Sequence, residues 1–190
     1  MELVHPIRDK KSLEAMKRVL RGGHEGLRNH CLFVLGVNSG LRVSDLLALH
    51  VDDVLGERGK VQDRIVLREQ KTGKSKDFPL GNTAKKAIAE YMATRPQCGR
   101  DEPLFLSRHG KALSRIQAWS ILSEAAKAVG IKESVGTHTL RKTFGYWAYV
   151  SGVDVTRIQK LLNHSAPSIT LAYIGITRDE LDNVYLTLDL

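Results

Sequence analysis

The sequence predicts a mainly α-helical domain with one small antiparallel β-sheet, an α+β fold. Apolar residues recur at helical spacing along most of the 190 residues, whereas residues 51–80 contain two short strand-like runs around a glycine-containing turn. There is no low-complexity tract, internal repeat or linker, and a hydrophobic content of 42% can form one sizeable core. We therefore predict a single domain over residues 1–190.

The expected helices are defined by their apolar spacing and by residues typical of helix ends. Ser12, Asn82, Ser114, Thr137 and Asp154 are candidate N-caps, and glycines follow several of the patterns. In the last pattern, Leu181, Val184, Tyr185 and Leu188 share one face. The predicted helices cover residues 12–20, 26–38, 41–50, 83–95, 115–130, 138–152, 155–164 and 178–188.

The predicted sheet pairs residues 64–69 with residues 76–80 across the turn "QKTGKS". Its "GKS" resembles part of a phosphate-binding P-loop, but that motif needs glycine where Arg68 stands and a helix where a strand follows. The P-loop is therefore excluded. The turn is either a solvated charged tip or a flexible arm that presents Lys71 to a phosphodiester.

Composition and charge indicate the class of partner. The chain has 29 Lys and Arg against 21 Asp and Glu, a formal charge of +8, which favours a polyanion such as nucleic acid. No apolar run approaches the roughly 18 residues of a membrane span, and the N-terminus lacks a secretory signal. Cys31 and Cys98 form no CxxC pair. We expect a reduced, cytoplasmic protein without membrane contact.

Two basic motifs have both an ordinary and a functional interpretation. In "HTLR", His138 and Arg141 share one side of a helix start, where free N–H groups suit a phosphate; alternatively, both are solvated. In "SGLRVSDLLAL", Arg42 follows a glycine turn and precedes an apolar run, with Asp45 three residues on. It is either a surface residue paired with Asp45 or a partly desolvated cation that needs an anionic partner.

The stretch "LLNHSAPSITLAYIGI" places His164 at an expected helix end and Tyr173 in a short segment separated from it by Pro167. From this stretch alone, Tyr173 is either a core aromatic or a nucleophile. The histidines and cysteines show no HExxH motif and no zinc-ligand spacing. We therefore predict no metal site and no cofactor.

Taken in order, four motifs resemble the catalytic domain of the tyrosine recombinase (phage integrase) family. They are "SGLRVSDLLAL", "QKTGKSKDFPL", "HTLR" and "LLNHSAPSITLAYIGI", and the resemblance runs from about residue 5 to the C-terminus. It implies that Tyr173 attacks the scissile phosphate. It also implies that cations and hydrogen-bond donors surround that phosphate, namely Arg42, Lys71, His138, Arg141 and His164.

The resemblance also implies a reaction and secondary roles. Strands would be cleaved and rejoined through a 3′-phosphotyrosine without metal, giving site-specific recombination of double-stranded DNA. Asp45 would orient Arg42 or Lys71 from behind. The expected assembly is a tetramer on synapsed DNA and a monomer when free, from a prokaryote, phage or mobile element. The lysines expected to contact DNA are Lys74, Lys76 and Lys142.

The chain departs from the family pattern in two respects. Asn163 stands where glycine is common, at a helix end that Asn also tolerates. The family usually carries an N-terminal DNA-clamping domain, which the resemblance does not cover here, so we expect either an excised catalytic domain or a natural minimal enzyme. The helix at 178–188 would pack on its own domain or on a neighbouring protomer, and its apolar stripe fits either.

Two other functions are compatible with these residues. A type IB topoisomerase resembles this fold and uses the same Arg/Lys/His/Tyr chemistry to relax supercoils as a monomer. A non-catalytic basic module would use the arginines and Lys71 only to hold phosphates. The "HTLR" motif, the short chain and the amphipathic tail favour the recombinase.

Overall fold

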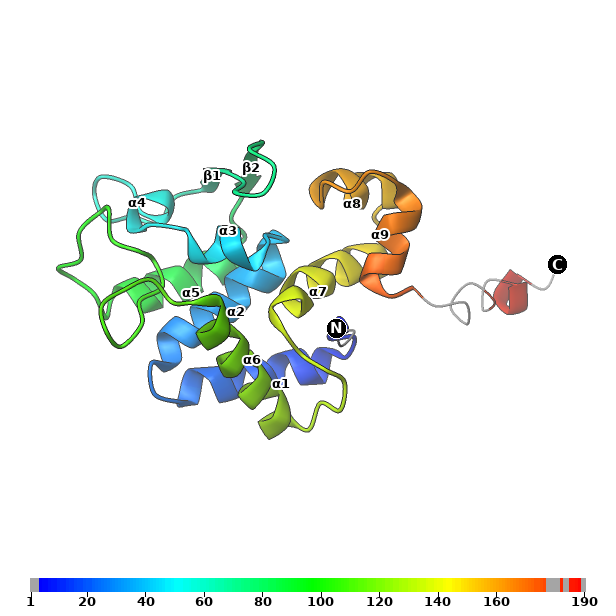
Figure 1. The fold of residues 1–190 in the computed structure, drawn as a ribbon, viewed down its shortest axis with the longest axis horizontal. Coiled ribbons are helices and arrows are strands. Elements are labelled where there is room, and N and C mark those ends of the chain that lie inside the picture. Colours follow the sequence, from blue (N-terminus) through cyan, green and yellow to red (C-terminus); the bar gives the residue numbers. More distant parts are fainter. Residues whose placement is uncertain (1–3, 177–181, 183–184, 189–190) are drawn as a thin grey trace.

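The computed structural model describes residues 4–176, 182 and 185–188 (Figure 1). It has the predicted composition of many helices and one small sheet. The helices and strands in chain order are α1 (Lys10–Gly22), α2 (Gly26–Ser39), α3 (Val43–Leu47), α4 (Val51–Val54), β1 (Arg64–Arg68), β2 (Ser75–Pro79), α5 (Asn82–Met92), α6 (Arg115–Val129), α7 (Thr137–Val150), α8 (Val155–Leu161) and α9 (Pro167–Ile174).

The main core forms around α2, which packs against α1, α5 and α7. Leu32, Phe33, Val34 and Leu35 follow one another in α2 and are all buried, so this helix is enclosed on most sides. That agrees with its nearly continuous apolar sequence, which is typical of a central helix. The main core therefore fixes the end of α2, from which the first part of the site begins.

The sheet consists of β1 and β2, paired antiparallel from Arg64 opposite Pro79 to Arg68 opposite Ser75. The predicted strands are confirmed to within one residue at their ends. Ile65 is fully buried in the main core, while most of the other strand residues are exposed. The sheet is thus anchored at its base, and its turn extends toward α7 and α8 (Figure 1).

Helix α7 connects the main core to a second, smaller cluster. In the described chain, the fully buried members of this cluster are Ile158, Leu162 and Ile174, from α8, its C-cap and α9. Gly145 of α7 permits their approach, because a Cβ there would lie 2.6 Å from Ile174 Cγ2. Figure 1 shows α8 and α9 at one end of α7, beyond the main body.

Several predicted helix ends are shifted. Asp9, rather than Ser12, caps α1 and accepts hydrogen bonds from the backbone N–H groups of Lys11 and Ser12. Asn82 and Thr137 are the first residues of their helices, because Gly81 and Gly136 hold the N-cap positions. The predicted caps Ser114 and Asp154 are confirmed, and Gly40 and Gly130 follow α2 and α6 with left-handed backbones.

The region around the tyrosine differs from expectation in detail. Tyr173 lies on a helix, α9, which starts at Pro167 after α8 ends at Leu161, so His164 lies in the connecting loop. The apolar pattern of this segment predicts that Ile169 and Leu171 hold it against the core. In α9, however, Thr170 and Ile174 face inward, Leu171 is half-buried and Ile169 is exposed.

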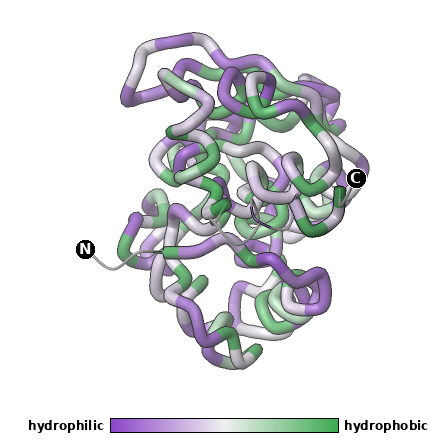
Figure 2. The backbone as a smooth tube through the Cα atoms, turned by 90° about the vertical axis from the view of Figure 1, so that its right-hand side faces the viewer, coloured by the Kyte–Doolittle hydropathy of each residue, from purple (hydrophilic) through white to green (hydrophobic). Residues whose placement is uncertain are grey.

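The last predicted helix, 178–188, lies largely outside the described residues. Tyr185, one of the residues expected on its apolar face, is exposed. Figure 2 shows hydrophobic and hydrophilic residues alternating along the chain, as helices with one buried face require. Among the described helices, none is long and apolar enough to cross a membrane.

Candidate active site

The residues predicted to surround the phosphate meet in one cleft. They come from five separated parts of the chain: the start of α3, the β1–β2 turn, the first turn of α7, the α8–α9 loop and α9. The cleft has a volume of about 300 Å³ and is lined by Arg42, Lys71, His138, Arg141, Asn163, His164, Ser165, Ile169 and Tyr173.

Arg42 is positioned by the sharp end of α2. Gly40 there adopts a left-handed backbone, with φ +59°, which disfavours any residue with a side chain. A Cβ at this position would also lie 2.6 Å from the Phe144 ring, which is too close. Arg42 pairs with Glu69 at 2.9 Å and lies 3.9 Å from Asp45. The guanidinium is therefore held from behind by two buried carboxylates, as a partly desolvated cation requires.

Arg141 lies on the first turns of α7 and is only 3% exposed. Its guanidinium donates to the carbonyl of Gly40, 2.6 Å away, and to the carbonyl of Leu162. Burial lowers its pKa below the ordinary arginine value, although arginine stays charged under any ordinary condition. Arg141 thus joins the end of α2 to the end of α8.

His138 lies one turn before Arg141 and has an exposed side chain at the cleft. Its pKa is lowered by partial desolvation and then by nearby cations, of which Arg115 has the largest effect. The imidazole is therefore mainly neutral near pH 7, the form that accepts a proton.

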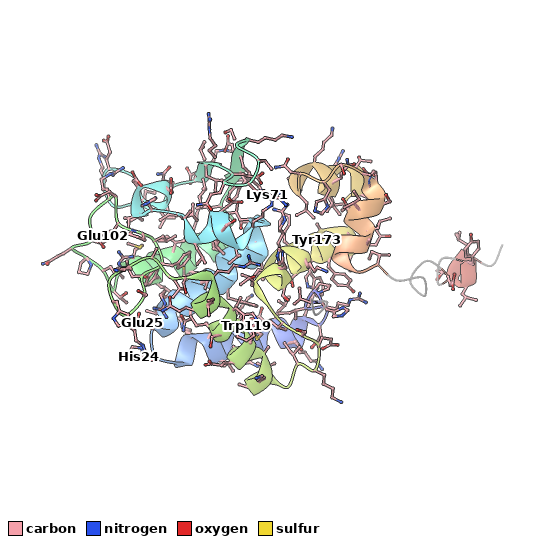
Figure 3. All side chains as sticks on the ribbon, in the orientation of Figure 1. His24, Glu25, Lys71, Glu102, Trp119 and Tyr173 are labelled. Atoms are coloured by element: carbon pink, nitrogen blue, oxygen red, sulfur yellow. The ribbon has the colours of Figure 1, made fainter. Side chains whose placement is uncertain are left out.

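Lys71 extends from the turn between β1 and β2, and Figure 3 shows it close to Tyr173, which comes from α9 on the other side of the cleft. Its two neighbours are tied to the buried carboxylates. The Gln70 N–H donates to Asp45 Oδ1 at 2.9 Å, and the Thr72 hydroxyl donates to Glu69 at 2.6 Å. Lys71 therefore projects from a turn held on both sides.

The three lysines expected to contact DNA differ in environment. Lys74 is exposed at the turn. Lys76 is half-buried, and its ammonium donates to the carbonyls of Gly40 and Leu161; burial, then repulsion by Arg141, lowers its pKa to about 8. Lys142 is 9% exposed and lies 5.1 Å above the Tyr173 ring. DNA contact stays a prediction for all three, and Lys74 is the accessible one.

His164 stands beside the tyrosine, with ring centroids 4.8 Å apart and planes at 71°. Its Nδ1 lies 3.1 Å from the Thr170 hydroxyl, and its backbone N–H donates to the Gln159 carbonyl. Desolvation, then repulsion by Arg141 and Arg42, lowers its pKa to about 4. The ring is therefore neutral at physiological pH.

Tyr173 is half-buried among these groups. Burial raises the pKa of its hydroxyl, and attraction by Arg141 and then Arg42 works in the opposite direction without overcoming it. Without DNA the side chain is therefore a neutral phenol. Among the other tyrosines, Tyr91 is buried in the main core, and Tyr146 and Tyr149 pack against the small cluster.

Sequence reasoning missed Glu69 and Thr170. Glu69 is a fully buried carboxylate behind Arg42, and Thr170 is a fully buried hydroxyl beside His164. A charged residue at the inner end of a strand, directly before the predicted turn, was the available signal for Glu69. In the described residues there is no group of three or more His, Cys, Asp or Glu side chains arranged to hold a metal ion.

The fold, with a tyrosine facing a set of cations, defines a class of enzymes that break and rejoin DNA, to which the tyrosine recombinases belong. The phage integrase family model matches residues 7–180, and the chain belongs to that family. The family resemblance, the fold class and the enzyme class inferred from the motifs are thereby confirmed.

Two relatives illustrate the relationship. The probable integrase/recombinase YoeC of Bacillus subtilis is 43% identical over 180 residues, which cover 94% of this chain and 93% of the relative. The tyrosine recombinase XerD of Corynebacterium glutamicum is 33% identical over 162 residues, covering 84% of this chain but 52% of the relative. The chain thus spans nearly all of YoeC and about half of XerD.

Solved structures show the same fold at lower sequence identity. XerA recombinase superposes with a TM-score of 0.77 at 20% identity, over 98% of this chain and 64% of that one. XerH site-specific recombinase, solved in a post-cleavage complex with its palindromic difH substrate, gives a TM-score of 0.75 at 19% identity. The match covers 99% of this chain and 54% of XerH.

Proposed function

We propose that this chain carries out site-specific DNA recombination by cleaving and rejoining strands through a covalent bond between Tyr173 and a 3′ phosphate. Family membership supports the reaction class. The observation that carries the assignment of residues is the single cleft that gathers Tyr173 with two arginines, two histidines and Lys71 from five parts of the chain.

The cations have a direct role in this reaction. In-line attack on a phosphodiester passes through a pentacovalent state with more negative charge on the non-bridging oxygens, which fixed donors stabilise. Arg42 and Arg141 each offer a planar fork to such oxygens. Both are already held in place, Arg42 by Glu69 and Arg141 by two carbonyls, so little rearrangement is needed when the phosphate arrives.

The protons follow a balanced path. The Tyr173 oxygen forms the bond to phosphorus, and His138 takes the phenol proton. The bond to the 5′ oxygen breaks, and Lys71 donates a proton to that departing oxygen. A 5′ hydroxyl from another strand then reverses these steps, so rejoining needs no external energy source.

His164 is assigned a neutral role. When the Thr170 hydroxyl donates to Nδ1, the ring proton resides on Nε2, and this nitrogen can donate to a phosphate oxygen without carrying a charge. The pKa of about 4 supports a neutral donor at physiological pH.

The partner and setting follow from the same proposal. The formal charge of +8 and DNA-bound structures such as XerH support double-stranded DNA as the substrate. We propose that residues 1–190 act as one catalytic domain in the cytoplasm, assembling as a tetramer on paired DNA sites. Lys74 would contact the backbone, with Lys76 and Lys142 supporting the cleft.

A covalent trap tests the function. The protein is mixed in EDTA with nicked duplexes of randomised sequence and denatured, and the attached DNA is recovered and sequenced. Wild type should form an adduct, whereas Tyr173→Phe should form none and bind DNA nearly as well, since only a hydroxyl is removed. A preferred captured sequence supports recombination; sequence-indifferent capture favours topoisomerase activity. No adduct despite intact DNA binding would contradict the assignment of Tyr173.

A further inference from the structure

Glu69 holds together three separate parts of the active-site cleft. One oxygen of its buried carboxylate, Oε2, accepts from the Thr72 hydroxyl at 2.6 Å and from the Asn163 amide at 2.9 Å, and it pairs with Arg42 at 2.9 Å. These partners belong to the β1–β2 turn, the α8–α9 loop and the start of α3. Despite burial, these donors lower its pKa, so the group is anionic.

The backbone of Glu69 also closes the turn that carries Lys71. Its N–H donates to the carbonyl of Lys74 at 2.9 Å, and its carbonyl accepts from Gly73 at 2.8 Å. Movement of the Glu69 side chain would therefore carry the turn with it. Lys71 has no comparable anchor of its own and is exposed at the cleft.

Asn163 provides the contact from the opposite side of the cleft. Its backbone is left-handed, with φ +49°, a conformation that glycine adopts freely and Asn tolerates. Unlike glycine, Asn supplies an amide that reaches Glu69 from a residue 94 positions away. The following residue, His164, is held separately by Gln159 and Thr170. The loop is therefore a fixed support against which the turn can be held.

We propose that the Asn163–Glu69 hydrogen bond fastens the β1–β2 turn to the α8–α9 loop, and so holds Lys71 where it can protonate the leaving oxygen. Asn163 and Glu69 are thus positioning residues that act through Lys71. The effect on cleavage rests on the proposed function; the coupling between turn and loop does not.

Asn163→Gly is the most informative variant, because glycine accepts the left-handed backbone and the change removes only the side-chain amide. Arg64→Ala is the matched control: it breaks an exposed ion pair with Asp77 on the same sheet, away from the cleft. Glu69→Gln is a second variant that keeps the shape and removes the charge. Melting curves verify that each variant is folded.

Hydrogen exchange in the full chain without DNA tests the coupling. In Asn163→Gly, the amides of Glu69 and Gly73 should exchange about tenfold faster, consistent with losing one hydrogen bond to a charged group. The amides of α2 should be unchanged, and Arg64→Ala should leave the turn amides unaffected. Unchanged exchange at Glu69 and Gly73 in Asn163→Gly would overturn the coupling.

Cleavage of two substrates tests the role of the coupling. One has the ordinary 5′ oxygen at the nick and the other a sulfur in its place; a thiolate leaves with its electron pair and needs no proton. Asn163→Gly and Glu69→Gln should cleave the oxygen substrate about tenfold more slowly than wild type. Asn163→Gly should cleave the sulfur substrate at nearly the wild-type rate, as Lys71→Ala should.

The outcomes separate the two claims. Equal slowing of Asn163→Gly on both substrates would indicate general damage to the cleft and overturn the positioning of Lys71, as would a wild-type rate on oxygen. No cleavage of either substrate by the wild-type chain would overturn the proposed function instead, and hydrogen exchange would still decide whether turn and loop are coupled.

Discussion

The two cores of this molecule differ in size, and the residues of the cleft are divided between them. The main core, around α2, supports Arg42 and the β1–β2 turn. The small cluster, whose fully buried members in the described chain are Ile158, Leu162 and Ile174, supports Tyr173 and the loop of His164. The charge-stabilising groups thus stand mainly on the well-packed part, and the nucleophile stands on the thinly packed part.

Polar contacts to carbonyl groups connect the two parts next to the cleft. Arg141 and Lys76 both donate to Gly40, at the end of α2, and each also donates to a carbonyl at the end of α8. In the described chain, the small cluster has three fully buried apolar side chains and the main core has many more, so apolar burial contributes less to the position of the small cluster. Its position relative to the main body therefore depends in part on these two cations, of which Arg141 also has a proposed role in the reaction.

Removing the strongest of these connections should have the largest effect. Arg141→Ala eliminates both transition-state stabilisation and the link between Gly40 and Leu162, so DNA cleavage should fall by about 10²–10³-fold or more. Single-turnover cleavage of a nicked duplex measures this. Arg64→Ala, which removes an exposed cation outside the cleft, serves as the control. An Arg141→Ala enzyme that cleaves at the wild-type rate would remove this residue from the site.

Weakening the small cluster should destabilise α8 and α9 without destabilising the main core. Ile174→Ala deletes a fully buried side chain and should cost about 2–5 kcal/mol, chiefly in local opening of α8 and α9. Amides of α9 should exchange much faster while amides of α2 keep their protection. Leu32→Ala in the main core is the counterpart and should lower protection throughout. Equal loss in both regions after Ile174→Ala would show a single cooperative unit.

Part of the pH dependence of stability should come from His164, in the loop that the small cluster supports. The pKa of His164 is lowered from 6.5 to about 4, so the unfolded chain binds the proton more readily between these values. Stability should therefore rise with pH from about 4 to about 6.5, and His164→Gln should reduce that slope. Urea unfolding at several pH values measures it. If the free energy of unfolding rose equally steeply with pH in His164→Gln and in wild type, His164 would not be the group responsible for the rise.

The smallest effect is expected at the exposed tip of the sheet. Lys74→Ala should weaken DNA binding equally for all sequences and reduce the slope of log affinity against log salt by about one. Binding titrations from low to moderate salt measure this slope, with Arg64→Ala on the side of the sheet as the control. A Lys74→Ala slope equal to wild type would exclude this lysine from phosphate contact.

The sequence was sufficient where the local pattern determines the outcome. The N-cap at Ser114, the glycine after α2 and the turn between the strands all appeared close to where they were predicted. Only the family resemblance implied that the four motifs would meet in one cleft. No spacing along the chain indicates that Arg42 and Tyr173 would line the same cleft.

The sequence was insufficient where the partner is distant in the chain. Glu69 looked like one more charge beside a basic turn, and its importance appears only when Arg42 and Asn163 are brought to it. Similarly, Lys76 alternates with exposed strand residues, but its long side chain reaches back to Gly40 and Leu161. On α9, burial of Thr170 in place of Ile169 depends on how the helix docks on α7, which helical periodicity leaves open.

The close packing at Gly145, where only glycine fits, offers a practical route to a temperature-sensitive enzyme. A methyl group there would meet Ile174, so Gly145→Ala should push α9, and with it Tyr173, away from α7. Overpacking of this kind costs about 1–3 kcal/mol, a penalty that moderate heating can make decisive. Gly145→Ala is therefore a rational starting point for a temperature-sensitive allele, active in cool cultures and silent in warm ones, while the main body stays folded.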